Sequence, residues 1–393
     1  MTDDSARLTR AYYWYQATAS CVFFWPVFFL YYEDRAGLGE ATILWLQSYA
    51  VAVRALLDVP CGAVADRYSR RLCLQLSAVA YLAGALVLVA YPTLAVAVIA
   101  ETAFAAAAAF KSGADSALLY DALDAAGRLD HYPRAEGRAQ AVASLGSGAT
   151  AIVGGLLAAL DLRLPYLATI IAAAASAVFA ARLADDRRRH AAGAAAPALR
   201  DAVRLARAGA IRWLLALAAM TVTASHVYFY VQQPYLRAIG IPVAGFGIAF
   251  AATKVVTAML STVAHRVDAR LGPRGAALVM TTAPAVGFGL MSLATGPFGA
   301  LLLLTRGVLD GLWPPLLNVY MNRLVPSRLR ATMLSVQSLV ARLALSAGLA
   351  LLGVGVEHGG LPATLAAVAI GVAVAGGALV LTMPAAVRPA GNA

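Results

Sequence analysis

Long runs of apolar residues alternate along this chain with short polar segments. A helix needs about 20 mostly apolar residues to cross a hydrocarbon layer about 30 Å thick, because each residue adds about 1.5 Å. Membrane-spanning strands instead alternate apolar and polar residues over about ten positions. The pattern therefore predicts an all-α protein with twelve membrane-spanning helices. We expect these helices near residues 11–31, 42–64, 73–91, 94–117, 138–160, 166–184, 211–232, 243–264, 275–294, 298–318, 331–354 and 361–382.

A long polar stretch at mid-chain divides the predicted helices into two sets of six. Short sequence matches also recur in the same order on its two sides: Ala65-Asp66-Arg67 with Ala264-His265-Arg266, and Arg138-Ala139 with Arg330-Ala331. Duplicated halves with a site at their interface are a known transporter architecture. We therefore predict a six-helix bundle over residues 1–184, a cytoplasmic linker over 185–210 and a second bundle over 211–393.

The composition excludes a water-soluble protein. Hydrophobic residues make up 61% of the 393 positions and charged residues 13%, whereas soluble domains average about 45–50% and about 25%. The net charge of +11 by itself suggests nucleic acid as a partner, but the basic residues concentrate in every second loop. This asymmetry is typical of cytoplasmic loops. We expect a multi-pass protein of the inner membrane, with both termini cytoplasmic and no nucleic-acid binding.

The three cysteines give no sign of a metal site. Cys21, Cys61 and Cys73 fall in or beside the predicted spans, without the spacing of metal ligands. We expect buried free thiols, no disulfide framework, no metal and no cofactor.

The loop after the second span carries a motif with a physical purpose. Gly62 would let two helices approach closely, and Asp66 could accept hydrogen bonds from a helix N-terminus. The motif resembles the signature of the major facilitator superfamily, Gly-x-Leu-Ala-Asp-Arg-x-Gly-Arg-Arg/Lys, with Val64 and Ser69 as departures. The resemblance implies the major facilitator fold. It also implies a gating role for Gly62, Asp66, Arg67, Arg70 and Arg71.

A finer resemblance points to a bacterial subgroup associated with small-molecule or drug efflux. Its marks are Arg54-x-x-x-Asp58-x-Pro60-x-Gly62, Ser112-Gly113-x-x-x-Ala117-Leu-Leu-Tyr120-Asp121 and Arg330-Ala-Thr-x-Leu-Ser335. Drug:proton antiporters of the family carry Gly-Pro-x-x-Gly-Gly in span five. This chain keeps Gly154-Gly155 there but has Thr150-Ala151 in place of Gly-Pro, which puts antiport mechanics in question.

Several charged residues lie within predicted spans, where each costs at least about 2.5–3.5 kcal/mol and calls for a partner or a purpose. Three pairs have a spacing of four, which places both members on one helical face: Arg54 with Asp58, Lys111 with Asp115, and Arg306 with Asp310. Structural pairing and a direct part in gating or coupling both fit this spacing.

Glu101 differs, because no basic residue lies three or four positions away. A carboxyl group in a medium of low dielectric can exchange protons near neutral pH, and Glu101 is therefore the leading candidate for proton coupling. Asp58, Asp115 and Asp310 are further candidates. The alternative is that Glu101 is hydrogen-bonded to another helix.

Spans one, four, seven and ten line the substrate path in the family that the chain resembles. Candidates for that path, with cations that could face it, are Phe24, Trp25, Glu101, His226, Tyr230, Gln233, Lys254, Trp313 and Arg342. Packing or lipid contact is an equally good explanation for many of them.

The sequence predicts a secondary active transporter that works by alternating access, as a monomer in the lipid bilayer. Its expected partners are protons and a small amphipathic or aromatic molecule, which it exports. The alternative is an importer or facilitator of a small metabolite. A receptor or an enzyme is remote, because the chain lacks a His-Glu-x-x-His motif, a phosphate loop and a nucleophile elbow.

Overall fold

The computed structural model describes residues 3–112, 114–183, 201, 204–326 and 329–387. The side chains of residues 3–8, Asp66 and Ala331 also lie outside this description. All regular elements in the described residues are helices. The chain forms two compact units. Unit 1 comprises Met1–Gly39, Tyr49–Ala192 and Pro242–Ala251, and unit 2 comprises Glu40–Ser48, Gly193–Ile241 and Ala252–Ala393.

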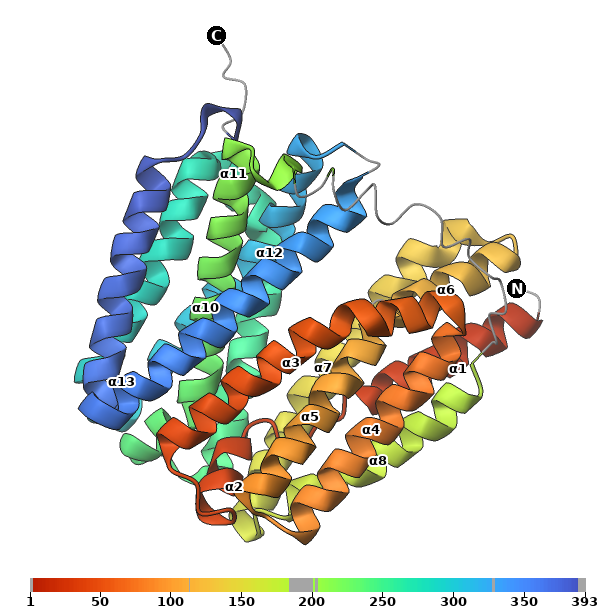
Figure 1. Ribbon diagram of the computed structural model, residues 1–393, viewed down its shortest axis with the longest axis horizontal. Helices are drawn as coiled ribbons and strands as arrows, with labels where there is room; N and C mark the ends of the chain where they lie inside the picture. The colour runs from red at the N-terminus through yellow and green to blue at the C-terminus, as the bar shows by residue number, and fades with distance from the viewer. Residues whose placement is uncertain (1–2, 113, 184–200, 202–203, 327–328, 388–393) are drawn as a thin grey trace. The chain divides into compact units, whose positions relative to one another are not determined.

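Unit 1 is built around α4, which packs against α5 and α8, while α1 packs against α7 and α8 (Figure 1). A buried core of Tyr12, Tyr15, Leu74 and Leu118 joins these helices. The elements are α1 (Asp3–Ala19), α2 (Phe28–Asp34), α3 (Glu40–Arg67), α4 (Arg70–Ala90), α5 (Leu94–Lys111), α6 (Ala114–Ala125), η1 (Leu129–His131), α7 (Tyr132–Leu160) and α8 (Leu164–Ala181).

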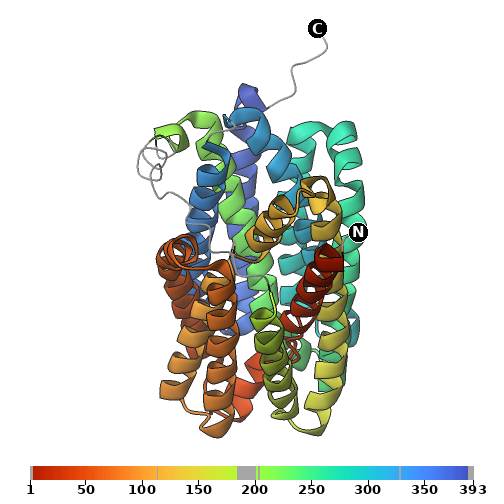
Figure 2. The same ribbon diagram turned by 90° about the vertical axis from the view of Figure 1, so that its right-hand side faces the viewer.

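Unit 2 is organised around α10, which packs against α12 and α13 and buries most of its length. Figures 1 and 2 both show α10 running beside the α13 helices. Its elements are α10 (Gly209–Ala238), α11 (Val243–Leu293), η2 (Pro297–Leu304), α12 (Thr305–Leu324), α13 (Arg330–Leu381) and η4 (Ala385–Val387).

The helices confirm the predicted twelve spans. Nine helical segments of the described residues are long and apolar enough to cross a membrane. Two of them, α11 and α13, each contain two spans, because Gly272 at φ 67° and Gly360 at φ 70° interrupt the helix. Glycine adopts a positive φ at little cost, and the proline that follows within two residues favours a new helix start. The short helices α1 and α2 together supply the twelfth span.

Two helices belong to both units. The first part of α3 contacts α13 within unit 2, where Ser48 Oγ donates 2.7 Å to the Ser346 carbonyl and Ser346 Oγ donates 2.9 Å to the Ser48 carbonyl. The first part of α11 contacts α7 within unit 1, where a methyl group on Gly247 would lie 2.1 Å from the Ala151 carbonyl oxygen. Small residues therefore allow close helix approach at both places.

Candidate functional site

The first predicted span is interrupted in its middle. α1 ends at Ala19 and α2 begins at Phe28, so the intervening backbone cannot make the regular hydrogen bonds of a helix. Pro26 contributes to the interruption because proline has no N–H to donate. The Phe23 N–H instead donates 3.0 Å to Thr169 Oγ1 on α8. Interrupted helices at membrane depth are typical of transporter binding sites.

A glycine on α7 makes room for this interruption. A methyl group on Gly154 would lie 1.8 Å from the Phe23 carbonyl oxygen, well inside van der Waals contact. The neighbouring Gly155 faces Gly247, where a methyl group would lie 2.9 Å from the backbone nitrogen. The two glycines that the chain shares with the antiporter motif therefore serve two close backbone contacts within unit 1.

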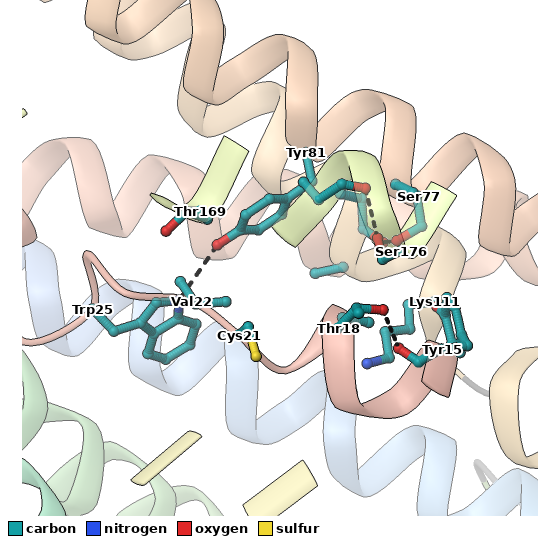
Figure 3. A pocket seen from close by; sticks show the side chains of 15 residues that line it. Tyr15, Thr18, Cys21, Val22, Trp25, Ser77, Tyr81, Lys111, Thr169 and Ser176 are labelled. Atoms are coloured by element: carbon teal, nitrogen blue, oxygen red, sulfur yellow. Dashed lines mark hydrogen bonds between the residues drawn. The ribbon is translucent and has the colours of Figure 1, made fainter. Parts of the chain in front are cut away.

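A cavity of about 160 Å³ lies beside the interruption. It is lined by residues of α1, the interrupted segment, α4, α5 and α8. In Figure 3 Lys111 and Thr18 lie towards one end, and Trp25 and Thr169 lie towards the other. The lining residues are Tyr15, Thr18, Ala19, Cys21, Val22, Trp25, Ser77, Ala78, Tyr81, Ala107, Ala108, Lys111, Thr169, Ala173 and Ser176.

The hydroxyl groups of Ser77, Thr169 and Ser176 in this lining are oriented by hydrogen bonds to helix carbonyls, which for Ser77 belong to the neighbouring α5. Ser77 Oγ donates 2.7 Å to the Ala107 carbonyl and Ser176 Oγ donates 2.8 Å to the Ala173 carbonyl. Thr169 Oγ1 donates 2.7 Å to the Pro165 carbonyl. A hydroxyl that has donated its proton can still accept, so this wall can receive N–H and O–H groups of a solute.

Lys111 adds a positive charge to this lining. Its ammonium group lies 5.7 Å from the ring centroid of Tyr15, a distance at which cation and ring attract each other. α5 ends at Lys111 and α6 begins at Ala114, so Lys111 and Asp115 do not share one regular helix. Asp115 Oδ2 accepts a 3.2 Å hydrogen bond from Gln16 Nε2. Lys111 is therefore placed to attract an acidic group in the cavity.

Aromatic side chains form a continuous cluster at the other end. The Phe24 ring stacks on Tyr166 at 4.3 Å and on Tyr81 at 6.2 Å between centroids, and Tyr81 also lies 4.9 Å from Phe104. Trp25 Nε1 donates 3.4 Å to the Tyr81 hydroxyl, and its side chain is 42% exposed. The predicted path residues Phe24 and Trp25 thus lie in one cluster, with only Trp25 facing the cavity.

Glu101 lies on α5, ten residues before Lys111, and is buried. Its Oε1 accepts a 2.7 Å hydrogen bond from the hydroxyl of the buried Tyr32 on α2. The helical rise separates Glu101 from Lys111 by about 15 Å along the helix. The carboxylate and the cation therefore lie at separate levels of the same unit.

In the gating motif, Arg70 has the clearest contacts. It donates 2.8 Å to the Ala117 carbonyl and forms an ion pair with Asp121, both on α6. Arg67 is exposed beside Tyr68, and Arg71 is the second residue of α4. A methyl group on Gly62 would meet no heavy atom of the described residues within 4 Å. The Asp66 side chain lies outside the description.

Unit 2 contains a buried charged cluster on α10 and α12. Arg306 Nε lies 3.2 Å from Asp310 Oδ2, one helical turn away, and Ser225 Oγ donates to Asp310 Oδ1. The Arg306 guanidinium also lies 5.2 Å from the Phe229 ring centroid. Arg306 and Asp310 therefore form an ion pair within unit 2.

The remaining candidates are distributed along the helices. His226 donates 2.8 Å from Nδ1 to the Val222 carbonyl of its own helix. Tyr230, Gln233 and Trp313 are buried in unit 2, and Lys254 is half-buried there. The half-buried positions that remain are Arg54 and Asp58 on α3 and Arg342 on α13.

Several cavity residues escaped the sequence analysis. Ser77 and Tyr81 lie four apart, and Thr169 and Ser176 seven apart, so each pair occupies one helical face. The sequence signal that could have identified them is the helical spacing of polar residues within the apolar third and sixth spans.

An ion pair joins two described loop residues of unit 1 outside the membrane-spanning segments. Arg35, after α2, lies 2.8 Å from Asp161, which follows α7. The Arg163 backbone N–H donates 2.8 Å to the Asp161 carboxylate. This hydrogen bond first, and then Arg35, holds the pKa of Asp161 below its usual value.

Comparisons with known proteins support this architecture. The family model described as Major Facilitator Superfamily matches residues 16–349. No curated protein matches the chain.

Solved structures are similar over nearly the whole chain. The nucleoside transporter NupG superposes with a TM-score of 0.80 at 14% identity, covering 96% of this chain and 98% of NupG. A D-xylose-proton symporter gives 0.72 at 13% identity, covering 97% of each chain. A POT family transporter in complex with 5-aminolevulinic acid gives 0.69 at 14% identity, covering 98% of this chain and 96% of that one. At these low sequence identities, the similarity shows a shared fold and nothing more.

Proposed function

The chain belongs to the Major Facilitator Superfamily, and from this premise we propose that it is a proton-coupled transporter that exports a small amphipathic or aromatic molecule. The observation that carries the proposal is the cavity at the interrupted first span, which combines aromatic rings, hydroxyl acceptors and one cation. We also place the chain in the inner membrane with both termini cytoplasmic, because of the distribution of its arginines.

The lining of the cavity defines the proposed solute. Trp25 and Tyr81 offer aromatic surface, and the oriented hydroxyls of Ser77, Thr169 and Ser176 accept hydrogen bonds. Lys111, at the far end of the cavity from Trp25 (Figure 3), favours an acidic group. A planar aromatic acid with a donor group satisfies all three features. The lining of the cavity therefore matches an amphipathic solute better than a purely apolar one.

Proton coupling is assigned to Glu101. Its burial and its hydrogen bond from Tyr32 hold it in a defined position away from water. A buried carboxyl group is less stable in its charged form than in its neutral form. A change in its protonation can therefore bias a conformational equilibrium. Asp58, Asp115 and Asp310 are secondary candidates, and Arg306 and Ser225 already engage Asp310.

Export is the proposed direction because of the sequence marks shared with the efflux-like subgroup. Import is the second candidate. It is favoured by the fold neighbours, which include a structure titled D-xylose-proton symporter and a nucleoside transporter. The gating motif serves either direction, with Arg70 joining the start of α4 to α6.

Purified protein in liposomes with an imposed pH gradient tests this function. Salicylate, ethidium, uridine and xylose represent an aromatic acid, an aromatic cation, a nucleoside and a sugar. We expect salicylate to move against its gradient, with protons moving in the opposite direction. Co-transport of solute and protons in one direction would identify the importer instead.

Empty liposomes are the first control, because weak acids also cross bilayers unaided. Liposomes without a gradient are the second. Equal flux with and without the gradient would contradict proton coupling, and absence of any protein-dependent flux would contradict the proposed solute class.

A further inference from the structure

A second cavity, of about 280 Å³, lies at the end of unit 1 where α1 begins and α6 ends. Figure 1 shows the start of α1 close to α6 at this end. The cavity lies where α1, α6, η1 and α7 meet, away from the interruption of the first span. Its lining residues are Thr9, Tyr13, Leu123, Arg128, His131, Arg134, Ala135 and Arg138.

Half of these lining residues are basic, and none is acidic. Arg134 and Arg138 lie four apart in the first turns of α7 and therefore face the same side. Arg128 Nη2 lies 3.1 Å from His131 Nε2. Among the described side chains near the cavity, Asp130 Oδ2 lies 3.5 Å from His131 Nε2, and Glu136 Oε1 accepts a hydrogen bond from Gln140. Three arginines thus converge on one small volume.

Like charges repel, so an anion bound between the three arginines would lower their mutual repulsion. Guanidinium groups bind phosphate with two parallel hydrogen bonds. The N-terminal turn of α7, which carries Arg134, adds a partial positive charge. The side chains of Thr9 and Tyr13 also line the cavity. A carboxylate could bind here, but a phosphate with more oxygens uses more of these donors.

The position of the cavity points to the membrane surface. Next to Tyr13, Trp14 is 55% exposed on α1, and exposed tryptophan near a helix end is typical of the headgroup region. The spans formed by α1, α6 and α7 all end or begin at this level. Basic pockets between membrane helices at this depth bind phospholipid headgroups.

We propose that this arginine pocket, formed by Arg128, His131, Arg134 and Arg138 with Thr9 and Tyr13, binds a phosphate group. The phosphate belongs either to an anionic phospholipid headgroup or to a soluble phosphate compound. The site is separate from the substrate cavity and does not depend on the proposed transport function.

The test compares wild type with the double substitution R134Q/R138Q. The matched control is R266Q/R270Q, which also removes two exposed arginines four apart, on α11. Delipidated protein in neutral detergent is titrated with phosphatidylglycerol, with phosphatidylcholine and with inorganic phosphate. Retained lipid is measured by native mass spectrometry, and stabilisation by the shift in unfolding temperature.

We expect phosphatidylglycerol to bind wild type and R266Q/R270Q equally, and R134Q/R138Q at least about tenfold more weakly. Binding of phosphatidylglycerol without an effect of inorganic phosphate assigns the site to a lipid. Stabilisation of wild type by inorganic phosphate, lost in R134Q/R138Q, assigns it to a soluble phosphate. Binding that is equal in all three proteins, or absent with both probes, overturns the proposal. If the double variant fails to fold, the titrations of wild type with phosphatidylglycerol and inorganic phosphate still test whether the protein binds a phosphate group.

Discussion

The Tyr32 hydroxyl donates a 2.7 Å hydrogen bond to Glu101, and both side chains are buried. The two residues are 69 positions apart and lie on α2 and α5, so the bond connects the second half of the interrupted span to the helix that carries Lys111. A hydrogen bond to a charged group contributes about 1.5–3 kcal/mol. The protonation of Glu101 is therefore tied to the packing of α2.

Replacing Glu101 by Gln should abolish solute movement driven by a pH gradient and leave solute-for-solute exchange intact. The amide keeps the size and can still accept from Tyr32, but it cannot release a proton. Tyr32→Phe should retain driven transport with a changed pH dependence. Flux in proteoliposomes across a pH series measures both.

The matched control is Glu357→Gln, at an exposed position on α13. Driven transport that persists in Glu101→Gln would remove Glu101 from the proton pathway and direct attention to Asp58, Asp115 and Asp310.

Gly154→Ala should destabilise unit 1. The added methyl group would lie 1.8 Å from the Phe23 carbonyl oxygen, so the interrupted segment has to move, and overpacking of this kind costs about 1–3 kcal/mol or more. Gly148→Ala on the same helix is the control, because a methyl group there meets no atom within 4 Å. Thermal unfolding in detergent should show a lower midpoint for Gly154→Ala alone. Equal midpoints would show that the interruption adapts freely.

Lys111→Gln should weaken recognition of an acidic solute and spare a neutral one. Loss of a charge-assisted hydrogen bond of about 1.5–3 kcal/mol corresponds to about tenfold or more in affinity. Competition by salicylate should therefore fall at least about tenfold, while competition by salicylamide stays unchanged. Lys111→Arg, which keeps the charge, should restore part of the effect. A parallel loss for both solutes would indicate that Lys111 only supports the fold.

The Arg35–Asp161 pair predicts an acid-dependent term in stability. The folded protein holds the pKa of Asp161 below its ordinary value of 3.8, so the ionised form is favoured by folding. This stabilisation is present above about pH 4 and is lost as the pH falls through the lower folded pKa. The unfolding midpoint of wild type should therefore fall more steeply than that of Asp161→Asn between about pH 6 and about pH 3. Parallel curves would contradict this assignment. The effect should be small because the pair is exposed and screened by solvent.

The twelve spans could be predicted because each needs only a local run of apolar residues. The details of the site could not, because they depend on partners far away in sequence. Nothing near Phe23 in the sequence indicates that its N–H donates to the Thr169 hydroxyl on α8. Likewise, Glu101 could be recognised as isolated on its own helix, whereas its partner Tyr32 arrives from another one. The close contact of Gly154 with the Phe23 carbonyl, which accommodates the interruption of the first span, also joins residues far apart in the sequence.

The interrupted first span has a consequence for how the protein is made. α2 has only seven residues, too few to cross a bilayer unaided, and the open backbone between α1 and α2 cannot be satisfied by lipid. Gly154 and Thr169, which accommodate and bind this backbone, emerge from the ribosome more than a hundred residues later. The first crossing to be synthesised therefore reaches its final form only after the fifth and sixth have joined it, so the order of synthesis and the order of completion differ.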